Sequence, residues 1–227
     1  MEQINAAYWP GENSCDENVC RHLPCFGVRQ RQQNNNSSSG HERGPSKGAN
    51  PPAISAIENR RRLYFLSDMS PTVRSAHLSD AGAMAALINK IIKTGGATAY
   101  RQPFDKQGIV EHFIKPPYGI NCAVALGNVE IVGFQALEWS DPDWPGADKL
   151  PADWAIIATY VALGHHGRGI GRSLFAATLA AARAAGVRCI DATIRFENPG
   201  GQAYYDRMGF VDYRIDKATI SKKLDLA

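Results

Sequence analysis

Glycines and basic side chains alternate between residues 164 and 173, where the sequence reads Gly-His-His-Gly-Arg-Gly-Ile-Gly-Arg-Ser. An apolar strand pattern precedes this segment and a helical pattern follows it. Glycines let the backbone approach a phosphate closely, and the first turn of a helix offers unpaired N–H groups at the positive end of its dipole. A tight turn alone would need one glycine. Alternating glycines with Arg168 and Arg172 among them therefore favour an anion-binding loop.

Two common phosphate-binding motifs do not fit this loop. A dinucleotide fingerprint that starts at Gly167 and Gly169 requires a glycine three positions later, where this sequence has Arg172. A P-loop ends in Gly-Lys-Ser or Gly-Lys-Thr, whereas Ile170 follows Gly169 here. The phosphate ligand is therefore expected to belong to another class.

A tyrosine that could supply a proton lies in a second segment, residues 198–210. Asn198 and Pro199 are typical of a helix start, and Gly209 is suited to the left-handed residue that ends a helix. The helix between them carries Tyr205. Because the ordinary pKa of tyrosine is about 10, this hydroxyl is protonated at neutral pH and can act as an acid. The local pattern alone is a capped helix and requires no function.

The glycine loop resembles the pyrophosphate loop of the GNAT N-acetyltransferases, whose pattern is Gln or Arg, two residues, Gly, one residue, and Gly or Ala. His166, Gly169 and Gly171 occupy those positions. His166 departs from the usual Gln or Arg, which affects a side-chain contact but not a cradle of backbone N–H groups. The resemblance implies that the loop binds the pyrophosphate of coenzyme A through its backbone.

The second segment resembles the other GNAT signature, in which Asn, Tyr and Gly-Phe recur at the same spacing. The resemblance gives Asn198 a contact with the pantetheine of coenzyme A and gives Tyr205 the role of protonating the leaving thiolate. Gly201 stands where the family commonly has Ala. The resemblance covers residues 71–227, and within the family the chain looks most like the phosphinothricin-acetyltransferase type of small-molecule acetyltransferases.

Acetyl-CoA is accordingly the expected co-substrate, and no metal ion is expected. In the family, the central strand splits away from its neighbour, and its backbone near Thr159 to Val161 holds the pantetheine and the acetyl carbonyl. A donor N–H there would act as an oxyanion hole. The cofactor-binding residues that the resemblance implies are Thr159, Tyr160, Val161, His166, Gly167, Arg168, Gly169, Ile170, Gly171, Arg172, Ser173 and Asn198.

The general base is the least defined part of this site. Related enzymes often place a Glu on the central strand, but residues 156–161 contain no acid. We name Glu138 as the candidate base, beside Tyr205 as the candidate acid. The alternatives are deprotonation through water or one of the other titratable residues near the strands, which are Asp141, Asp143, Asp153 and His165.

The expected acceptor is an amine of a small molecule, such as an amino acid or an amino-acid analogue. Aromatic residues could form an apolar wall around it, although packing in the core is their more ordinary role; they are Tyr100, Phe104, Trp139 and Trp144. The alternatives are a protein N-terminal or lysine acetyltransferase and a non-catalytic module that binds acyl-CoA. Tyr205 favours catalysis over the module. A homodimer is left open.

These residues need an α/β domain to position them. Apolar periodicity predicts strands at 72–76, 120–126, 130–139, 154–163 and 188–194, with one or two more in 210–226. Helices are predicted from Ser79 or Asp80 to Lys93, from Asp105 to before Pro116, and at 171–185 and 199–208. With the resemblance, this order predicts the GNAT fold, a mixed, mostly antiparallel twisted sheet with helices on both faces.

Residues 1–68 differ in composition from the rest of the chain. Residues 30–52 are rich in Gln, Asn, Ser, Gly and Pro, which cannot bury enough apolar surface to offset the entropy of ordering. We expect a disordered extension before a domain at 69–227, with Met69 as an alternative start. Residues 54–66 could form a short basic helix that acts as a solvated tether. Cys15, Cys20 and Cys25 do not have the usual spacing of zinc ligands.

Charge and hydropathy limit the remaining options. A net charge of +3 over 227 residues argues against general nucleic-acid binding. No apolar run approaches the roughly 20 residues that span a bilayer, and the start of the chain does not have the pattern of a secretory signal. The five cysteines are odd in number and widely spread. We therefore expect a cytoplasmic protein without nucleic-acid or membrane partners.

Overall fold

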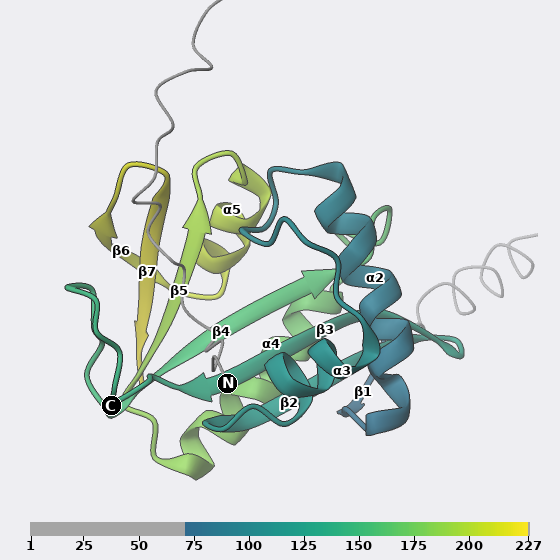
Figure 1. The fold of residues 1–227 in the computed structure, drawn as a ribbon, viewed down its shortest axis with the longest axis horizontal. Coiled ribbons are helices and arrows are strands. Elements are labelled where there is room, and N and C mark those ends of the chain that lie inside the picture. The colour runs from purple at the N-terminus through teal and green to yellow at the C-terminus, as the bar shows by residue number, and fades with distance from the viewer. Residues whose placement is uncertain (1–70, 227) are drawn as a thin grey trace, which may run out of the picture. The chain divides into compact units, whose positions relative to one another are not determined.

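The computed structural model describes residues 71–226, and the expectations for residues 1–68 lie outside this range. Within the described residues, seven strands form one sheet in the order β1-β2-β3-β4-β5-β7-β6 (Figure 1). The strands are β1 (Thr72–Ser75), β2 (Gly119–Gly127), β3 (Glu130–Trp139), β4 (Trp154–Val161), β5 (Cys189–Arg195), β6 (Val211–Ile215) and β7 (Thr219–Asp225). Only the β4–β5 pair is parallel, so the predicted mixed, mostly antiparallel sheet is confirmed.

Helices cover both faces of the sheet, as predicted. One face carries α2 (Ala81–Thr94), α3 (Lys106–Ile109) and a π-helical turn at Val110–Ile114, which pack over β2 and β3. The opposite face carries α4 (Ile170–Ala185) and α5 (Pro199–Arg207), whose apolar side chains form a second core with β4, β5 and β7. Figure 1 shows α2 and α3 in front of the sheet and α4 behind it.

Most of the predicted helix and hairpin boundaries are confirmed by local hydrogen bonds and backbone angles. Asp105 caps α3 by accepting from the Gly108 N–H at 2.7 Å. Gly186 ends α4 with φ 79°, and Asn128 turns the β2–β3 hairpin with φ 60°. Both angles lie in the left-handed region that glycine and asparagine tolerate best.

The start of α2 differs from the prediction, because the Asp80 side chain makes no capping bond to α2. Its carboxylate instead accepts from the Arg74 guanidinium at 2.7 and 2.9 Å and from the His77 N–H at 2.7 Å. The Arg74 hydrogen bond is the main reason why the pKa of Asp80 is lowered. Asp80 therefore ties β1 to the 3₁₀ turn (Leu78–Asp80) that leads into α2.

The parallel pair β4–β5 separates after three residue pairs. The pairs are Trp154↔Cys189, Ala155↔Ile190 and Ile156↔Asp191. Along its other edge, β4 stays paired with β3 as far as Val161. Figure 1 shows β4 and β5 starting side by side and then fanning apart. Among the described residues, the backbone of β4 between Ile157 and Val161 therefore has one edge without a neighbouring strand, and its polar groups can bind a ligand there. We call this gap the split.

Candidate active site

The glycine loop runs from the end of β4 at the open end of the split to the start of α4. Gly164, Gly167 and Gly169 have φ angles of 79°, 75° and 78°. A Cβ atom added at any of them would find no atom within 4 Å, so the backbone angle, not space, calls for glycine. The loop thus combines a left-handed backbone, which glycine adopts readily, with an open surface, and this combination suits the predicted binding of an anion.

The start of α4 supplies unpaired N–H groups beside this loop. The Ser173 N–H makes the first helical bond, to the Gly169 carbonyl at 3.0 Å, so the N–H groups of residues 170–172 precede the helical ladder. Ile170 is buried and anchors the helix end. The predicted basic side chains around it, His166, Arg168 and Arg172, are exposed. These groups could hold the pyrophosphate of coenzyme A at the positive end of a 16-residue helix.

Gly171 has a reason to be glycine that the sequence did not reveal. A Cβ atom there would lie 2.7 Å from Cε2 of Tyr204. The Tyr204 hydroxyl also donates to the Gly171 carbonyl at 2.9 Å. Gly171 therefore lets α5 pack closely on the first turn of α4. Sequence reasoning passed over Tyr204, although its place directly before Tyr205 is the signal that could have pointed to it.

Tyr205 and Thr159 meet inside the split. The Tyr205 side chain is 6% exposed, and its hydroxyl lies 2.9 Å from the Thr159 hydroxyl. Burial is the main reason why the pKa of Tyr205 is raised, so this hydroxyl is protonated at neutral pH. Of the other two residues predicted on this strand end, Val161 is the last residue of β4. Tyr160 points to the opposite face, where its ring lies 4.9 Å from that of Phe134.

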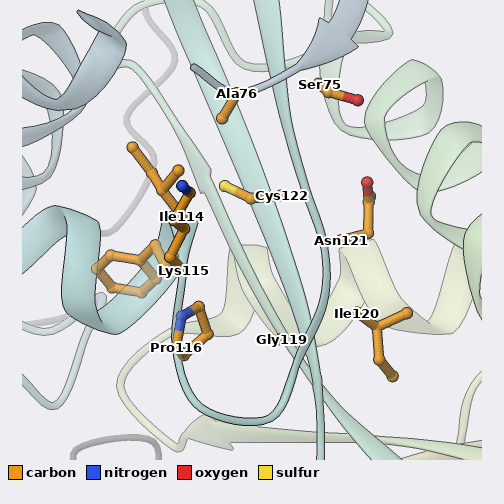
Figure 2. A pocket seen from close by; sticks show the side chains of 10 residues that line it. Ser75, Ala76, Ile114, Lys115, Pro116, Gly119, Ile120, Asn121 and Cys122 are labelled. Atoms are coloured by element: carbon orange, nitrogen blue, oxygen red, sulfur yellow. The ribbon is translucent and has the colours of Figure 1, made fainter. Parts of the chain in front are cut away.

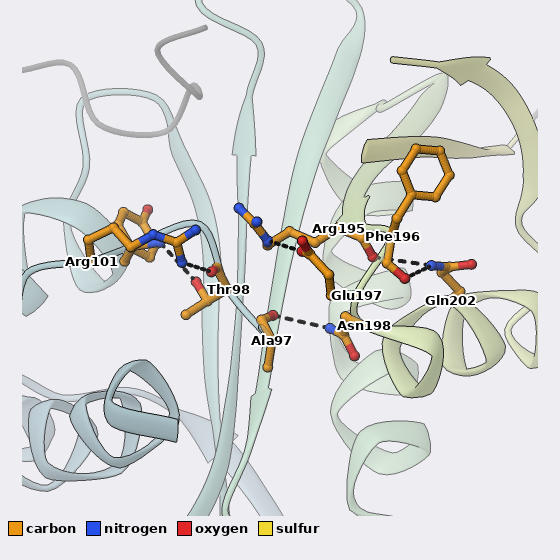
Figure 3. A network of polar contacts seen from close by, with 9 residues as sticks. Ala97, Thr98, Arg101, Arg195, Phe196, Glu197, Asn198 and Gln202 are labelled. Carbon is orange, nitrogen blue, oxygen red and sulfur yellow. Dashed lines mark hydrogen bonds and ion pairs between the residues drawn. The ribbon is translucent and has the colours of Figure 1, made fainter. Parts of the chain in front are cut away.

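Asn198 caps α5, as predicted, and also binds a second segment. Its Oδ1 accepts from the Gly201 N–H at 2.8 Å, and its Nδ2 donates to the Ala97 carbonyl at 3.1 Å (Figure 3). A Cβ atom on Gly201 would lie 2.6 Å from Nδ2 of Asn198. Glycine at this position, in place of the alanine common in the GNAT motif, therefore leaves room for the Asn198 side chain to bridge α5 and the loop after α2.

Glu138 lies on β3 at the inner end of the split. It is directly opposite Ile156, the last β4 residue that pairs with β5. Because side chains alternate between faces, Glu138 lies on the α2 face, whereas Thr159 and Tyr205 lie on the α4 face. Burial, and to a lesser extent the charge of Asp141, raises the pKa of Glu138 to about 7. A carboxylate with this pKa is suited to accept a proton near neutral pH.

A second carboxylate on the same rung of the sheet was missed by sequence reasoning. Asp191 on β5 pairs with Ile156, lies on the same face as Glu138, and is 3% exposed. It accepts from the Tyr213 hydroxyl at 2.6 Å. Burial raises the pKa of Asp191. The available signal was a lone acid within the apolar strand pattern of residues 188–194.

The predicted aromatic wall is divided between the two faces of the sheet. Tyr100 and Phe104 stack edge-to-face at 4.8 Å, within the cluster under α2. Trp139 packs into the other core, with α4 and α5. Trp144 donates from Nε1 to Asp148 at 2.8 Å. The four residues therefore do not form one wall, because strand alternation sends Trp139 to the opposite face.

A pocket elsewhere in the sheet contains none of the predicted site residues. It has a volume of about 400 Å³ and lies where β1 ends beside β2 (Figure 2). Its walls include Ser75, Phe113, Lys115 and Cys122. Burial raises the pKa of the Cys122 thiol to about 12, which makes it a poor nucleophile.

No group of three or more His, Cys, Asp or Glu side chains among residues 71–226 could hold a metal ion. None of the helices in this range is long and apolar enough to cross a membrane.

Comparisons with known proteins identify a family and a shared fold. The model of the acetyltransferase (GNAT) family matches residues 84–210. The yncA protein of Salmonella typhimurium, a candidate acetyltransferase solved with its cofactor acetyl-CoA, is 20% identical with a TM-score of 0.57, over 70% of this chain and 95% of that one. The ribosomal-protein-alanine N-acetyltransferase of Brucella melitensis is 21% identical with a TM-score of 0.57, over 68% of this chain and 99% of that one.

A third solved structure, a candidate phosphinothricin N-acetyltransferase, is 22% identical with a TM-score of 0.55, over 70% of this chain and 99% of that one. At these identities the three structures establish a shared fold. No curated protein matches the chain.

Proposed function

Because this chain belongs to the acetyltransferase (GNAT) family, we propose that it transfers the acetyl group of acetyl-CoA to an amine of a small molecule, such as an amino acid or an amino-acid analogue. The observation that carries the proposal is the continuity of three features. The free edge of β4 leads into the glycine loop, and the loop leads into the N-terminus of α4. A long ligand with a thioester at one end and phosphates at the other fits this order.

The split and the loop bind the donor in this proposal. The N–H groups of residues 170–172 and the backbone of the glycine loop hold the pyrophosphate, and Arg168 and Arg172 add screened charge from the surface. The free edge of β4 near Thr159 to Val161 binds the pantetheine as a neighbouring strand would. The Salmonella protein of the same fold, solved with acetyl-CoA, supports this assignment.

Tyr205 and Glu138 divide the proton transfers between the two faces of the sheet. The amine attacks the thioester carbonyl, the C–S bond breaks, and the thiolate takes the Tyr205 proton. The ordinary pKa of a thiol is about 8.5, below that of tyrosine, so donation to the thiolate is favourable only where the site stabilises the tyrosinate. Burial opposes this, and the Thr159 hydroxyl, 2.9 Å from that of Tyr205, lowers the pKa of Tyr205 and so offsets part of the effect of burial. Glu138 accepts the proton that the amine loses.

The acceptor enters from the α2 face in this proposal. Glu138 and Asp191 lie on that face, one strand to either side of Ile156. Carboxylates favour a cationic ammonium group, which loses one proton to water before the neutral amine attacks and a second proton to Glu138 as the amide forms. The fold shared with a candidate phosphinothricin N-acetyltransferase supports a small acceptor. The fold shared with a ribosomal-protein-alanine N-acetyltransferase supports a protein N-terminus as the second candidate.

Release of coenzyme A in the presence of different amines tests the proposal. The panel contains amino acids, amino-acid analogues, polyamines, a peptide with a free N-terminal alanine and a lysine peptide blocked at its N-terminus. Turnover with a free amino acid or an analogue would support the proposal. Turnover with a peptide alone would favour the second candidate. Acetyl-CoA binding without turnover on any amine would indicate a non-catalytic module.

A further inference from the structure

Gln135 lies at the centre of a buried group of polar side chains behind the split. It stands on β3 directly opposite Thr159, and its side chain is 0% exposed. Its Nε2 donates to the Thr159 hydroxyl at 2.7 Å and to the Tyr204 hydroxyl at 3.1 Å. Gln135 thus connects the strand end, the helix start and the candidate acid, although it is far from all three in sequence.

The amide nitrogen of Gln135 gives this group of hydrogen bonds a direction. An amide nitrogen carries two hydrogens and accepts none, so both hydroxyls must receive a bond from it. The Tyr204 hydroxyl then uses its own hydrogen toward the Gly171 carbonyl, 2.9 Å away. The Thr159 hydroxyl has the Tyr205 oxygen at 2.9 Å as the partner for its hydrogen. When Thr159 donates to it, Tyr205 keeps its own proton available to the split.

The carbonyl oxygen of the same amide supports a functional reason for Gln135. Within residues 71–226, Oε1 of Gln135 is buried without a hydrogen-bond partner. A buried unpaired acceptor is unfavourable, so natural chains keep one mainly where the rest of the side chain has a task. Leucine or methionine would fill this position without that penalty. The bonds from Nε2 are therefore the feature that glutamine supplies here.

From these contacts we infer that Gln135 is a positioning residue, which orients the Thr159 hydroxyl toward Tyr205 and so directs the Tyr205 proton to the leaving thiolate. The inference rests on the proposed function, in which Tyr205 is the acid. No covalent step changes, because Gln135 exchanges no proton and contacts no substrate. A hydrogen bond received from Thr159 lowers the pKa of Tyr205 and so offsets part of the rise that burial causes.

A double-mutant cycle between Gln135 and Tyr205 tests this inference. General acids typically raise the rate of a reaction about 100- to 10,000-fold. We expect Gln135→Met to remove part of this contribution and to lower kcat about tenfold. The KM for acetyl-CoA should change by less than about twofold. In a Tyr205→Phe background, Gln135→Met should lower kcat no further, because the proton that it orients is gone. A purely structural role would lower activity equally in both backgrounds.

Two further variants keep the test decisive. Thr159→Val breaks the same connection and should show the same loss and the same lack of additivity, even if Gln135→Met fails to fold. Thr178→Val is the control, since Thr178 is equally buried on the same face, in α4, and outside this group of side chains; its kcat should match that of the wild type. The inference would be wrong, and the proposed function would stand, if the losses of kcat were fully additive with that of Tyr205→Phe. The same would hold if Gln135→Met and Thr159→Val both had a normal kcat. A wild-type chain without turnover would refute the proposed function and the inference together.

Discussion

The hydroxyl groups of Thr159 and Tyr205 lie 2.9 Å apart and join β4 to α5 across the gap between β4 and β5. Thr159 stands on the strand edge that has lost its neighbour, and Tyr205 comes from the helix that follows β5. The contact therefore places a protonated phenol where the two strands have separated. A thioester bound along β4 would meet this phenol.

Removing the Tyr205 hydroxyl should slow chemistry and spare binding. Tyr205→Phe keeps the ring that stacks on Phe210 at 5.0 Å, so the fold should persist. We expect turnover to fall about 100- to 10,000-fold under conditions where chemistry limits the rate. The Kd for acetyl-CoA, measured by calorimetry, should change little. Tyr118→Phe, outside the split and directly before β2, is the control, and an equal loss in both variants would count against the assignment.

The glycine loop should bind the donor mainly through its backbone. Gly169 has φ 78°, which valine does not adopt without strain, so Gly169→Val should weaken acetyl-CoA binding about tenfold or more. Arg168→Ala should weaken it less, and His166→Ala least, because both side chains are exposed. Calorimetric titration measures this order. If His166→Ala were the most damaging, side-chain recognition would replace the backbone account.

A second glycine variant distinguishes an effect on acetyl-CoA binding from a general loss of stability in Gly169→Val. Gly186, at the far end of α4, has a similar φ of 79°. Gly186→Val should lower the melting temperature by a similar amount but leave the affinity for acetyl-CoA intact. Equal losses of affinity in Gly169→Val and Gly186→Val would mean that the loop effect is a general loss of folding.

Gly171 should be needed for the close packing of α5 on the first turn of α4. Gly171→Ala places a methyl group 2.7 Å from Cε2 of Tyr204, and such overpacking typically destabilises a protein by about 1–3 kcal/mol. Denaturant unfolding should show this loss. The same substitution in a Tyr204→Leu background should be less destabilising, because the ring that it meets is gone. Equal losses in the two backgrounds would rule out the Tyr204 contact as the cause.

Glu138 should give the reaction a pH dependence centred near neutrality. Its folded-state pKa is about 7, so the fraction able to accept a proton rises as pH rises through 7. We expect kcat/KM to rise through this range and Glu138→Gln to lower activity and remove that rise. Glu130→Gln, which changes an exposed acid at the opposite end of β3, is the control. An unchanged pH profile in Glu138→Gln would assign the base elsewhere or to water.

The same pKa has a consequence for stability. The folded pKa of about 7 exceeds the ordinary value of 4.5, so between these values the folded chain holds a proton that the unfolded chain has lost. Stability should therefore fall as pH rises through this window. Glu138→Gln cannot ionise and should be more stable than the wild type at pH 8. Urea unfolding at pH 5 and pH 8 measures the difference.

The domain should need nothing before residue 69. The strands and helices of residues 71–226 supply clusters of buried apolar side chains on both faces of the sheet. A chain that begins at Met69 should therefore fold and bind acetyl-CoA as the full chain does. Melting temperature and calorimetry compare the two. A large drop in either quantity would give the first 68 residues a role in the domain.

The sequence by itself determined the order of helices and strands and both motif segments. Asp105, Gly127-Asn128 and Gly186 act on their own neighbours, through a cap, a turn and a helix end, so their effect can be read locally. The family follows from similar local patterns, because the glycine loop and the helix that carries Tyr205 are each continuous in sequence. Asp80 was the exception, because its partner Arg74 lies on a different element.

Only the tertiary structure decided which of these residues meet. Strand pairing places Glu138, Ile156 and Asp191 on one rung, and loss of pairing after Ile156 opens the split. No short segment encodes the register of the paired strands or the point at which β4 and β5 separate, because both depend on how distant strands and helices pack together. The contacts of Tyr204 with Gly171 and of Gln135 with Thr159 have the same origin. Side-chain types and their order are local properties, whereas the geometry that lets them act together is set by packing across the whole sheet.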